Sequence, residues 1–168
     1  MPAGSTYEPI ATTSPTTSPT EIEFASITGT YTDLVLVLCG KTTATANVYV
    51  HINSDTGSNY SYTTLTGDGS TAASYRNSNI SVGMLLDYSA YPQNNNNDII
   101  IANFMNYANT TTYKTCISRG SNAAIGVDAN VSLWRSTSAI TNLKIRLGGG
   151  TGTWATGTIA TLYGIKAA

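Results

Sequence analysis

Two continuous runs of apolar residues dominate the hydrophobic pattern of the chain. They are Asp33–Cys39 and Asp98–Met105, and both are rich in β-branched side chains. Runs of this length suit central β-strands that are covered on both faces. The pattern therefore predicts two central strands whose side chains are buried on either side of a sheet.

Other segments alternate apolar and polar residues, as half-buried strands do. In Asn47–Ile52 the apolar side chains are predicted to point inward, and Tyr49 and His51 outward. In Asn142–Leu147 the two basic residues point outward in the same way. Further candidate strands are Glu21–Phe24, Tyr60–Thr66, Asn79–Leu85, Thr111–Ser118, Ile125–Leu133 and Ile159–Lys166.

Turn-forming residues separate these candidate strands. Asp55–Gly57, Gly67–Gly69 and Pro92–Asn97 carry the Gly, Asp, Asn and Pro residues that tight turns prefer. No window shows a convincing helical period of 3.6 residues. About eight to ten short strands at this spacing predict an all-β fold, either a β-sandwich or a barrel, over residues 21–168.

Residues 1–20 differ in composition from the rest of the chain. The segment Thr12–Thr20 repeats Thr, Ser and Pro without any apolar periodicity. Proline favours extended backbone and supplies no amide donor, and so polar a segment cannot bury enough surface to offset its ordering entropy. We therefore expect residues 1–20 to form an extended N-terminal arm that is mobile alone or ordered by a neighbour.

Composition narrows the classes of function. The chain has 168 residues, of which 10% are charged, and its net charge is −1, which disfavours a general nucleic-acid binder. Its length suits one domain. It contains neither a long apolar stretch that would span a membrane nor a secretory signal, so we expect no membrane partner. Cys39 and Cys116 are isolated and are expected to be buried free thiols.

The charges are unevenly distributed along the chain. Residues 1–100 hold eight acidic and two basic residues, whereas residues 101–168 hold one acidic and six basic residues. Distant segments pair in a Greek-key sandwich, so the split can mean complementary neighbouring strands. It can also mean that opposite parts of adjacent subunits attract each other.

Few residues suggest catalysis. His51 is the only histidine, and no nucleophile motif accompanies it. Most aspartates stand at strand edges or in turns, where Asp has a local hydrogen-bonding role. We therefore expect no enzymatic activity. A polysaccharide-degrading enzyme stays open as an alternative that would need an acid such as Asp55 or Asp87.

Metal and cofactor signals are similarly sparse. One histidine and two distant cysteines do not suggest a zinc site. Asn53–Asn59 places oxygen ligands at alternate positions but lacks the closing Glu of a calcium loop, so it is interpreted as a hairpin loop. Gly148–Gly152 lacks the Gly-Lys-Ser/Thr ending of a phosphate loop. No cofactor and no metal are expected.

Several segments in order resemble a group of small jelly-roll virion proteins of tailed bacteriophages. The resemblance spans nearly the whole chain, although the Thr-Ser-Pro repeat near the start departs from the Ala/Ser-rich stretch of the relatives. The segments that carry it are Tyr7–Thr13, Thr30–Val37, Asn53–Ser61, Asn106–Thr111, Leu133–Thr141 and Thr161–Lys166.

The resemblance implies a single jelly-roll β-sandwich and a structural role in a virion. We expect a capsid decoration (cement) protein on the capsid exterior, made in the cytoplasm of the host bacterium, with the major capsid protein as partner. Closed threefold symmetry would suit a homotrimer at the local threefold positions of the shell. The contact residues expected in the arm are Tyr7, Glu8 and Ile10. The alternative is a tail-fibre or knob module that binds carbohydrate on the host surface.

Overall fold

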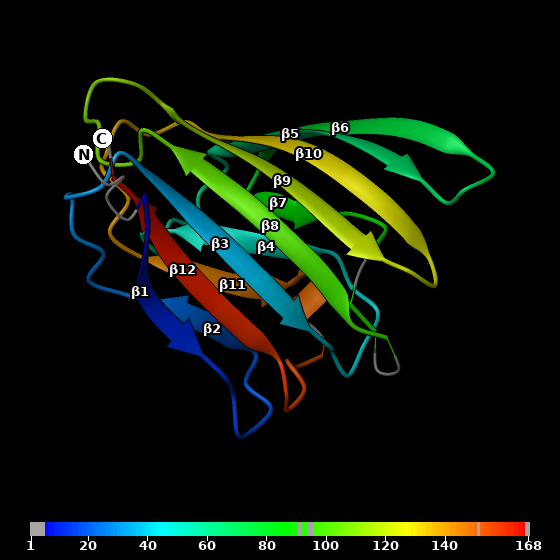
Figure 1. The fold of residues 1–168 in the computed structure, drawn as a ribbon. Coiled ribbons are helices and arrows are strands. Elements are labelled where there is room, and N and C mark those ends of the chain that lie inside the picture. The colour runs from blue at the N-terminus through cyan, green and yellow to red at the C-terminus, as the bar shows by residue number, and fades with distance from the viewer. Residues whose placement is uncertain (1–5, 91, 94–95, 151, 167–168) are drawn as a thin grey trace.

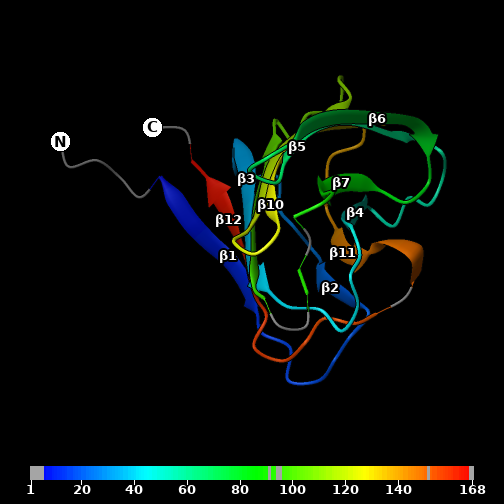
Figure 2. The ribbon, with the colours of Figure 1, turned by 90° about the vertical axis from the view of Figure 1, so that its right-hand side faces the viewer.

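The structure is a computed structural model that describes residues 6–90, 92–93, 96–150 and 152–166. It is a sandwich of two antiparallel β-sheets (Figures 1 and 2). The larger sheet has the order β1-β12-β3-β8-β9-β10-β5-β6 and the smaller has the order β2-β11-β4-β7. No helix in these residues is long and apolar enough to cross a membrane.

The strands of the larger sheet are β1 (Tyr7–Thr13), β3 (Asp33–Gly40), β5 (Tyr60–Gly67), β6 (Ala72–Ile80), β8 (Asp98–Met105), β9 (Lys114–Asn122), β10 (Gly126–Trp134) and β12 (Ile159–Ile165). Those of the smaller sheet are β2 (Glu21–Phe24), β4 (Val48–Ile52), β7 (Met84–Asp87) and β11 (Leu143–Leu147). A short 3₁₀ turn, Gly148–Gly150, follows β11.

The chain passes repeatedly from one sheet to the other. Successive strands from β1 to β5 alternate between the sheets, and β7, β11 and β12 continue the alternation after hairpins within the larger sheet. This wrapping makes the sandwich jelly-roll-like, and its all-β character confirms the fold class predicted from the hydrophobic pattern.

The core lies between the two sheets. Leu34, Leu36 and Leu38 of β3 are fully buried in it, because alternate residues of a strand point to the same face. Val48, Val50 and Ile52 contribute the facing layer from the smaller sheet. Trp154, in the connection to β12, is also fully buried.

Most predicted strands overlap the observed ones, but one predicted strand is wrong, and two observed strands, β1 and β6, were not predicted. The predicted strand Asn79–Leu85 is in fact the end of β6, a turn and the start of β7. Residues 7–13, which belong to the predicted arm, form β1 and pair with β12 at the edge of the larger sheet. Residues 1–5 of that arm lie outside the described residues.

The two apolar runs are central strands, but the expectation that both of their faces are covered was wrong. In β8 the buried residues alternate with exposed or half-exposed ones, and Ile99 is 49% exposed. No other described element crosses the outer face of the larger sheet, which faces the viewer in Figure 1. The described residues therefore cover only one face of these strands.

Tyr49 and His51 are buried, contrary to the prediction that they point into solvent. His51 is 5% exposed and Tyr49 is 8% exposed. Both lie on the outer face of the smaller sheet, where the β6–β7 connection and the hairpin β5–β6 cover them. The His51 ring contacts the carbonyl of Ser81, and Tyr49 packs with Tyr62 and Leu85.

Candidate functional site

The three residues predicted for capsid contact all lie on β1. Glu8 forms an ion pair with Lys166 at 2.6 Å and accepts a hydrogen bond from the Tyr31 hydroxyl at 3.4 Å. Ile10 is half-buried against the core, whereas Tyr7 is 59% exposed. Two of the three side chains therefore help to hold β1 against its own sheet, and Tyr7 is the one most available to a partner.

The outer face of the larger sheet, formed by the outward residues of β12, β3, β8, β9 and β10, is broadly apolar. The strand register aligns these residues in rows that run across the sheet. Its exposed apolar side chains are Ile99, Met105, Ile117, Val127, Val131 and Ile159. Monomeric soluble proteins rarely leave an apolar patch of this extent uncovered, so the face is a candidate interaction surface.

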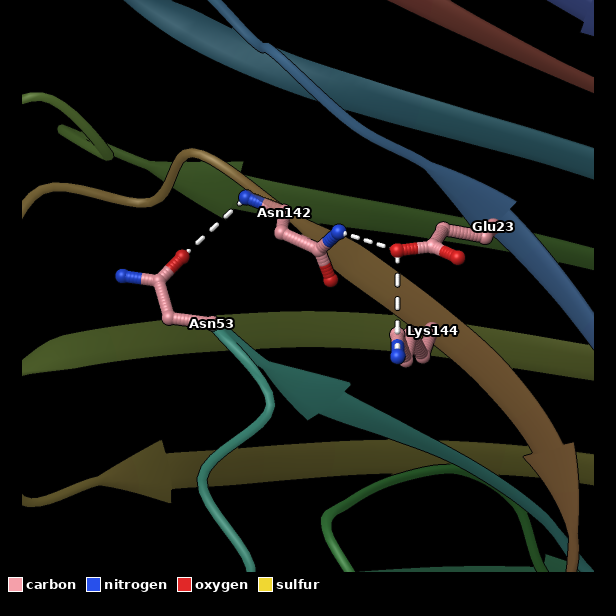
Figure 3. Close-up of polar contacts among 4 residues, drawn as sticks. All are labelled: Glu23, Asn53, Asn142 and Lys144. Carbon is pink, nitrogen blue, oxygen red and sulfur yellow. Dashed lines mark hydrogen bonds and ion pairs between the residues drawn. The ribbon is translucent and has the colours of Figure 1, made fainter.

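The corresponding face of the smaller sheet is polar. Glu23 of β2 lies opposite Lys144 of β11, and their charged groups are 3.8 Å apart (Figure 3). The Asn142 side-chain amide donates to Glu23 at 2.5 Å, and the side-chain oxygen Oδ1 of Asn53 accepts from the Asn142 backbone N–H at 3.1 Å. This ion pair and that between Glu8 and Lys166 join the acidic first part of the chain to the basic last part. Complementary neighbouring strands thus account for these charges.

A shallow hollow of about 620 Å³ lies over β5, β6, β9 and β10. Polar side chains dominate its lining, with Arg76 as the charged one. Just beyond it, Arg135 is fixed by hydrogen bonds to the Ser58 carbonyl and to Asn79, both at 2.9 Å. A hollow of this size, lined by hydroxyl, amide and guanidinium groups, can accept a small polar ligand.

His51 has the surroundings of a structural residue. Its Nε2 lies 3.0 Å from the Ser81 carbonyl, and its ring stacks against Tyr60 with centroids 6.1 Å apart. Burial lowers the pKa of His51. A buried neutral imidazole that donates to a carbonyl supports the sandwich rather than activating a nucleophile.

Asp55 organises the Asn53–Asn59 loop. Its carboxylate accepts hydrogen bonds from the Trp134 indole N–H at 2.7 Å, the Asn59 amide at 2.9 Å and the Gly57 backbone N–H at 2.8 Å. Burial opposes ionisation, but these hydrogen bonds outweigh it and lower the pKa of Asp55. The loop is thus tied to β10 through Trp134, but the prediction of a hairpin was wrong, because the loop connects β4 of the smaller sheet to β5 of the larger sheet.

Three buried carboxyl groups meet between the sheets, a cluster that sequence reasoning missed. Asp87 and Asp98 are fully buried, and Asp128 is 4% exposed. Asp128 accepts hydrogen bonds from the backbone N–H groups of Tyr88, Ser89 and Ala90. These bonds outweigh the opposing effect of burial and lower the pKa of Asp128.

Asp87 has no comparable donors among the described residues. Burial, together with hydrogen bonding to Asp98 and Asp128, raises its pKa strongly. Asp87 therefore holds a proton at neutral pH. A fully buried acid cannot meet a polysaccharide in solvent, so this residue supplies no surface catalytic acid.

The remaining reactive groups are also buried or scattered. Cys116 is fully buried and burial raises its pKa, whereas Cys39 is half-exposed on the outer face of the larger sheet. Lys114 is 1% exposed, and its ammonium group donates to the carbonyls of Thr112 and Thr137. Within the described residues, no group of three His, Cys, Asp or Glu side chains has the geometry of a metal site.

Comparisons of the chain with protein-family models, curated proteins and solved structures gave no match. The resemblance to phage virion proteins therefore stays a prediction.

Proposed function

We propose that the chain is a structural virion protein of a tailed bacteriophage that decorates the capsid exterior and cements neighbouring capsid subunits. Its mechanism would be adhesion without a chemical step. The partners in this proposal are the major capsid protein and further copies of the chain. The resemblance of the ordered sequence segments to jelly-roll virion proteins supports the proposal.

The observation that carries the proposal is the uncovered apolar outer face of the larger sheet. Ile99, Ile117 and Val131 each expose about half of their side chains there. A protein that assembles on a shell together with further copies of itself needs such a surface, because burial of apolar area is the main favourable term in protein association. Of the acids named for the enzyme alternative, Asp87 is buried and Asp55 is saturated with structural hydrogen bonds.

The test of the proposal is to locate the protein on intact particles that carry it, by imaging with a specific label. We expect many copies spread over the head. A few copies confined to the tail would contradict the decoration role and favour host recognition.

A second experiment examines the arm by measuring the binding of the chain to mature capsids after deletion of residues 2–20. We expect weaker binding than for the full chain. Tyr7→Ala serves as a matched variant, because it removes an exposed side chain while the other contacts of β1 stay in place. Full-strength binding by both variants would remove the arm from the mechanism.

The hollow beside Arg76 favours one alternative, a tail-fibre or knob module that binds carbohydrate. Its polar lining and its volume suit a sugar unit. This alternative would be supported if the protein bound to a glycan array and Arg76→Ala abolished that binding. Val82→Lys, in the β6–β7 connection, is the control and should leave the binding unchanged. Absence of binding to any host-surface glycan would count against it.

A further inference from the structure

The outer face of the larger sheet is apolar on strands whose other face already forms the core. Val35, Val37 and Cys39 of β3 point outward, while the intervening leucines point into the sandwich. Strands that carry apolar residues on both faces are typical of sheets covered on both sides. In the described part of the chain, no further layer of structure supplies the second cover (Figure 2), although Val35 itself is only 6% exposed.

The two outer faces of the sandwich differ in their charged residues, and this difference indicates which face is exposed to solvent. On the smaller sheet, Lys144 lies beside Glu23 and Arg146 beside Glu21 across the strands. On the larger sheet, three successive rows run across β12, β3, β8, β9 and β10, and Arg119 is the only charged residue in them.

The first row contains Ile159, Cys39, Ile99, Ser121 and Val127; the second contains Thr161, Val37, Ile101, Arg119 and Ala129; the third contains Tyr163, Val35, Asn103, Ile117 and Val131. A partner that covered this face would have to desolvate one charge. A surface so poor in charge costs little to bury.

The dimensions of the face approach those of a stable protein interface. Five strands spaced about 4.8 Å apart and about seven residues long span roughly 24 by 23 Å, which is on the order of 550 Å². Side-chain relief increases the accessible area further. Standard interfaces bury about 800 Å² on each partner.

We propose that a second copy of this chain covers the outer face of the larger sheet, with the exposed side chains of Ile117 and Val131 buried in the contact. Two such faces can pack as the sheets of a sandwich do, about 10 Å apart. A face almost without charge can meet its own copy without like-charge repulsion. With a net charge of −1, the chain has little electrostatic repulsion to keep a bare apolar face soluble before it reaches a capsid.

This inference rests on the proposed function only in treating the face as an assembly surface, and it assigns capsid contact to other parts of the protein. It also makes a statement about the isolated chain, which is tested without capsids. A failure of self-association would therefore leave the decoration role to be judged by its own experiment.

The test measures the molar mass of the full chain by light scattering over a concentration series. We expect an oligomer whose mass is a small multiple of that of one chain. The double variant Ile117→Lys/Val131→Lys places two charges on the face and should reduce the oligomer to a single chain. Val82→Lys, a charge on an exposed apolar residue of the β6–β7 connection, is the control and should leave the oligomer unchanged.

A milder double variant tests the same contact if the two lysines prevent folding. Ile117→Thr/Val131→Thr keeps β-branched residues at both positions, and we expect it to raise the dissociation constant at least tenfold. Cys39 gives a second readout, because it is half-exposed on this face while Cys116 is fully buried. In the oligomer Cys39 should react slowly with a thiol reagent, and in the lysine variant quickly.

A wild-type chain that stays monomeric at about 100 μM would overturn the proposal. So would an oligomer that persists unchanged in both face variants with Cys39 still unreactive, because the contact would then lie elsewhere.

Discussion

The Asp87 carboxyl group occupies the space that a side chain at Gly120 would fill. A Cβ atom placed at residue 120 would lie 2.6 Å from Oδ2 and 2.8 Å from Cγ of Asp87. Gly120 pairs with Asp128 across β9 and β10, and β7 brings Asp87 from the opposite sheet. The missing side chain on one sheet thus admits a buried acid from the other.

Replacing Asp87 with asparagine should stabilise the protein at neutral and alkaline pH. The folded state raises the pKa of Asp87 above its ordinary value of 3.8, chiefly by burial. The folded state then binds a proton that the unfolded chain releases, so its stability falls as pH rises above about 3.8. The loss approaches about 1.4 kcal/mol per pH unit between the two pKa values. Asparagine does not titrate and can donate to its carboxylate neighbours.

Urea unfolding at pH 5, 7 and 9 measures this effect. The wild-type free energy of unfolding should decline over the series more steeply than that of Asp87→Asn. Equal slopes for the two proteins would show that Asp87 is ionised in the folded state.

Asp128→Asn should do the opposite and destabilise the protein at neutral pH. The Asp128 pKa is lowered, because hydrogen bonds from the Tyr88, Ser89 and Ala90 backbone N–H groups outweigh burial. The stability that this carboxylate contributes is present above its ordinary pKa of 3.8 and is lost as pH falls toward the folded value. An amide offers one oxygen where the carboxylate offers two, so we expect a cost of about 1–3 kcal/mol at pH 7 in the same unfolding assay. An unchanged midpoint would argue against this account.

Gly120→Ala should destabilise the protein by about 1–3 kcal/mol through overpacking against Asp87. The clash involves the Asp87 carboxyl group, so Asp87→Ala should relieve much of it in the double variant. Gly67→Ala is the matched control, because a Cβ there meets nothing closer than 3.9 Å. Thermal unfolding of the four variants tests the coupling, and strictly additive effects of the substitutions at 87 and 120 would exclude it.

The hydrophobic pattern predicted the sandwich because most of its strands carry a clear apolar run or a clear alternation of apolar and polar residues. The runs Asp33–Cys39 and Asp98–Met105 became the central strands β3 and β8. The strand Ala72–Ile80 was missed because it is mostly exposed and carries no apolar alternation. Tyr7–Thr13 was assigned to the arm for the same reason. Its pairing with β12 depends on backbone hydrogen bonds, and the pattern of its side chains does not indicate them.

The buried acid cluster could not be predicted because it depends on contacts between distant segments. Asp87, Asp98 and Asp128 stand on three different strands from both sheets. In the sequence each looks like an ordinary aspartate at a strand edge. A glycine within an otherwise regular strand, such as Gly120, is the available signal, because it often marks a close approach. The sequence gives a clearer indication of the uncovered face. Strands β3 and β8 carry apolar residues on both faces, which is more than a single core face requires.

The hydrogen bond between Trp134 and Asp55 should couple the two residues in stability. The indole N–H donates to the carboxylate at 2.7 Å, and it is one of several donors that hold the loop before β5. We expect Asp55→Ala to cost about 1–3 kcal/mol and Trp134→Phe to cost less, because phenylalanine keeps most of the apolar contact. In a double-mutant cycle by urea unfolding, the combined cost should fall short of the sum by at least about 0.5 kcal/mol. If the cost of the double variant equals the sum of the two single costs, the hydrogen bond contributes no stability.

His51 should make the protein less stable in mild acid. Burial lowers its pKa from the ordinary value of 6.5, so the unfolded chain takes up a proton that the folded state resists. The folded state therefore loses stability as pH falls below about 6.5, down to the lowered pKa. His51→Gln keeps a donor for the Ser81 carbonyl but does not titrate in this range, and it should remove this part of the pH dependence. Thermal unfolding at pH 7.5, 6.5 and 5.5 measures the effect, with Gly67→Ala as a non-titrating comparison that should keep the pH dependence of the wild type. If the stability of His51→Gln changes between pH 7.5 and 5.5 by as much as that of the wild type, protonation of this imidazole does not contribute.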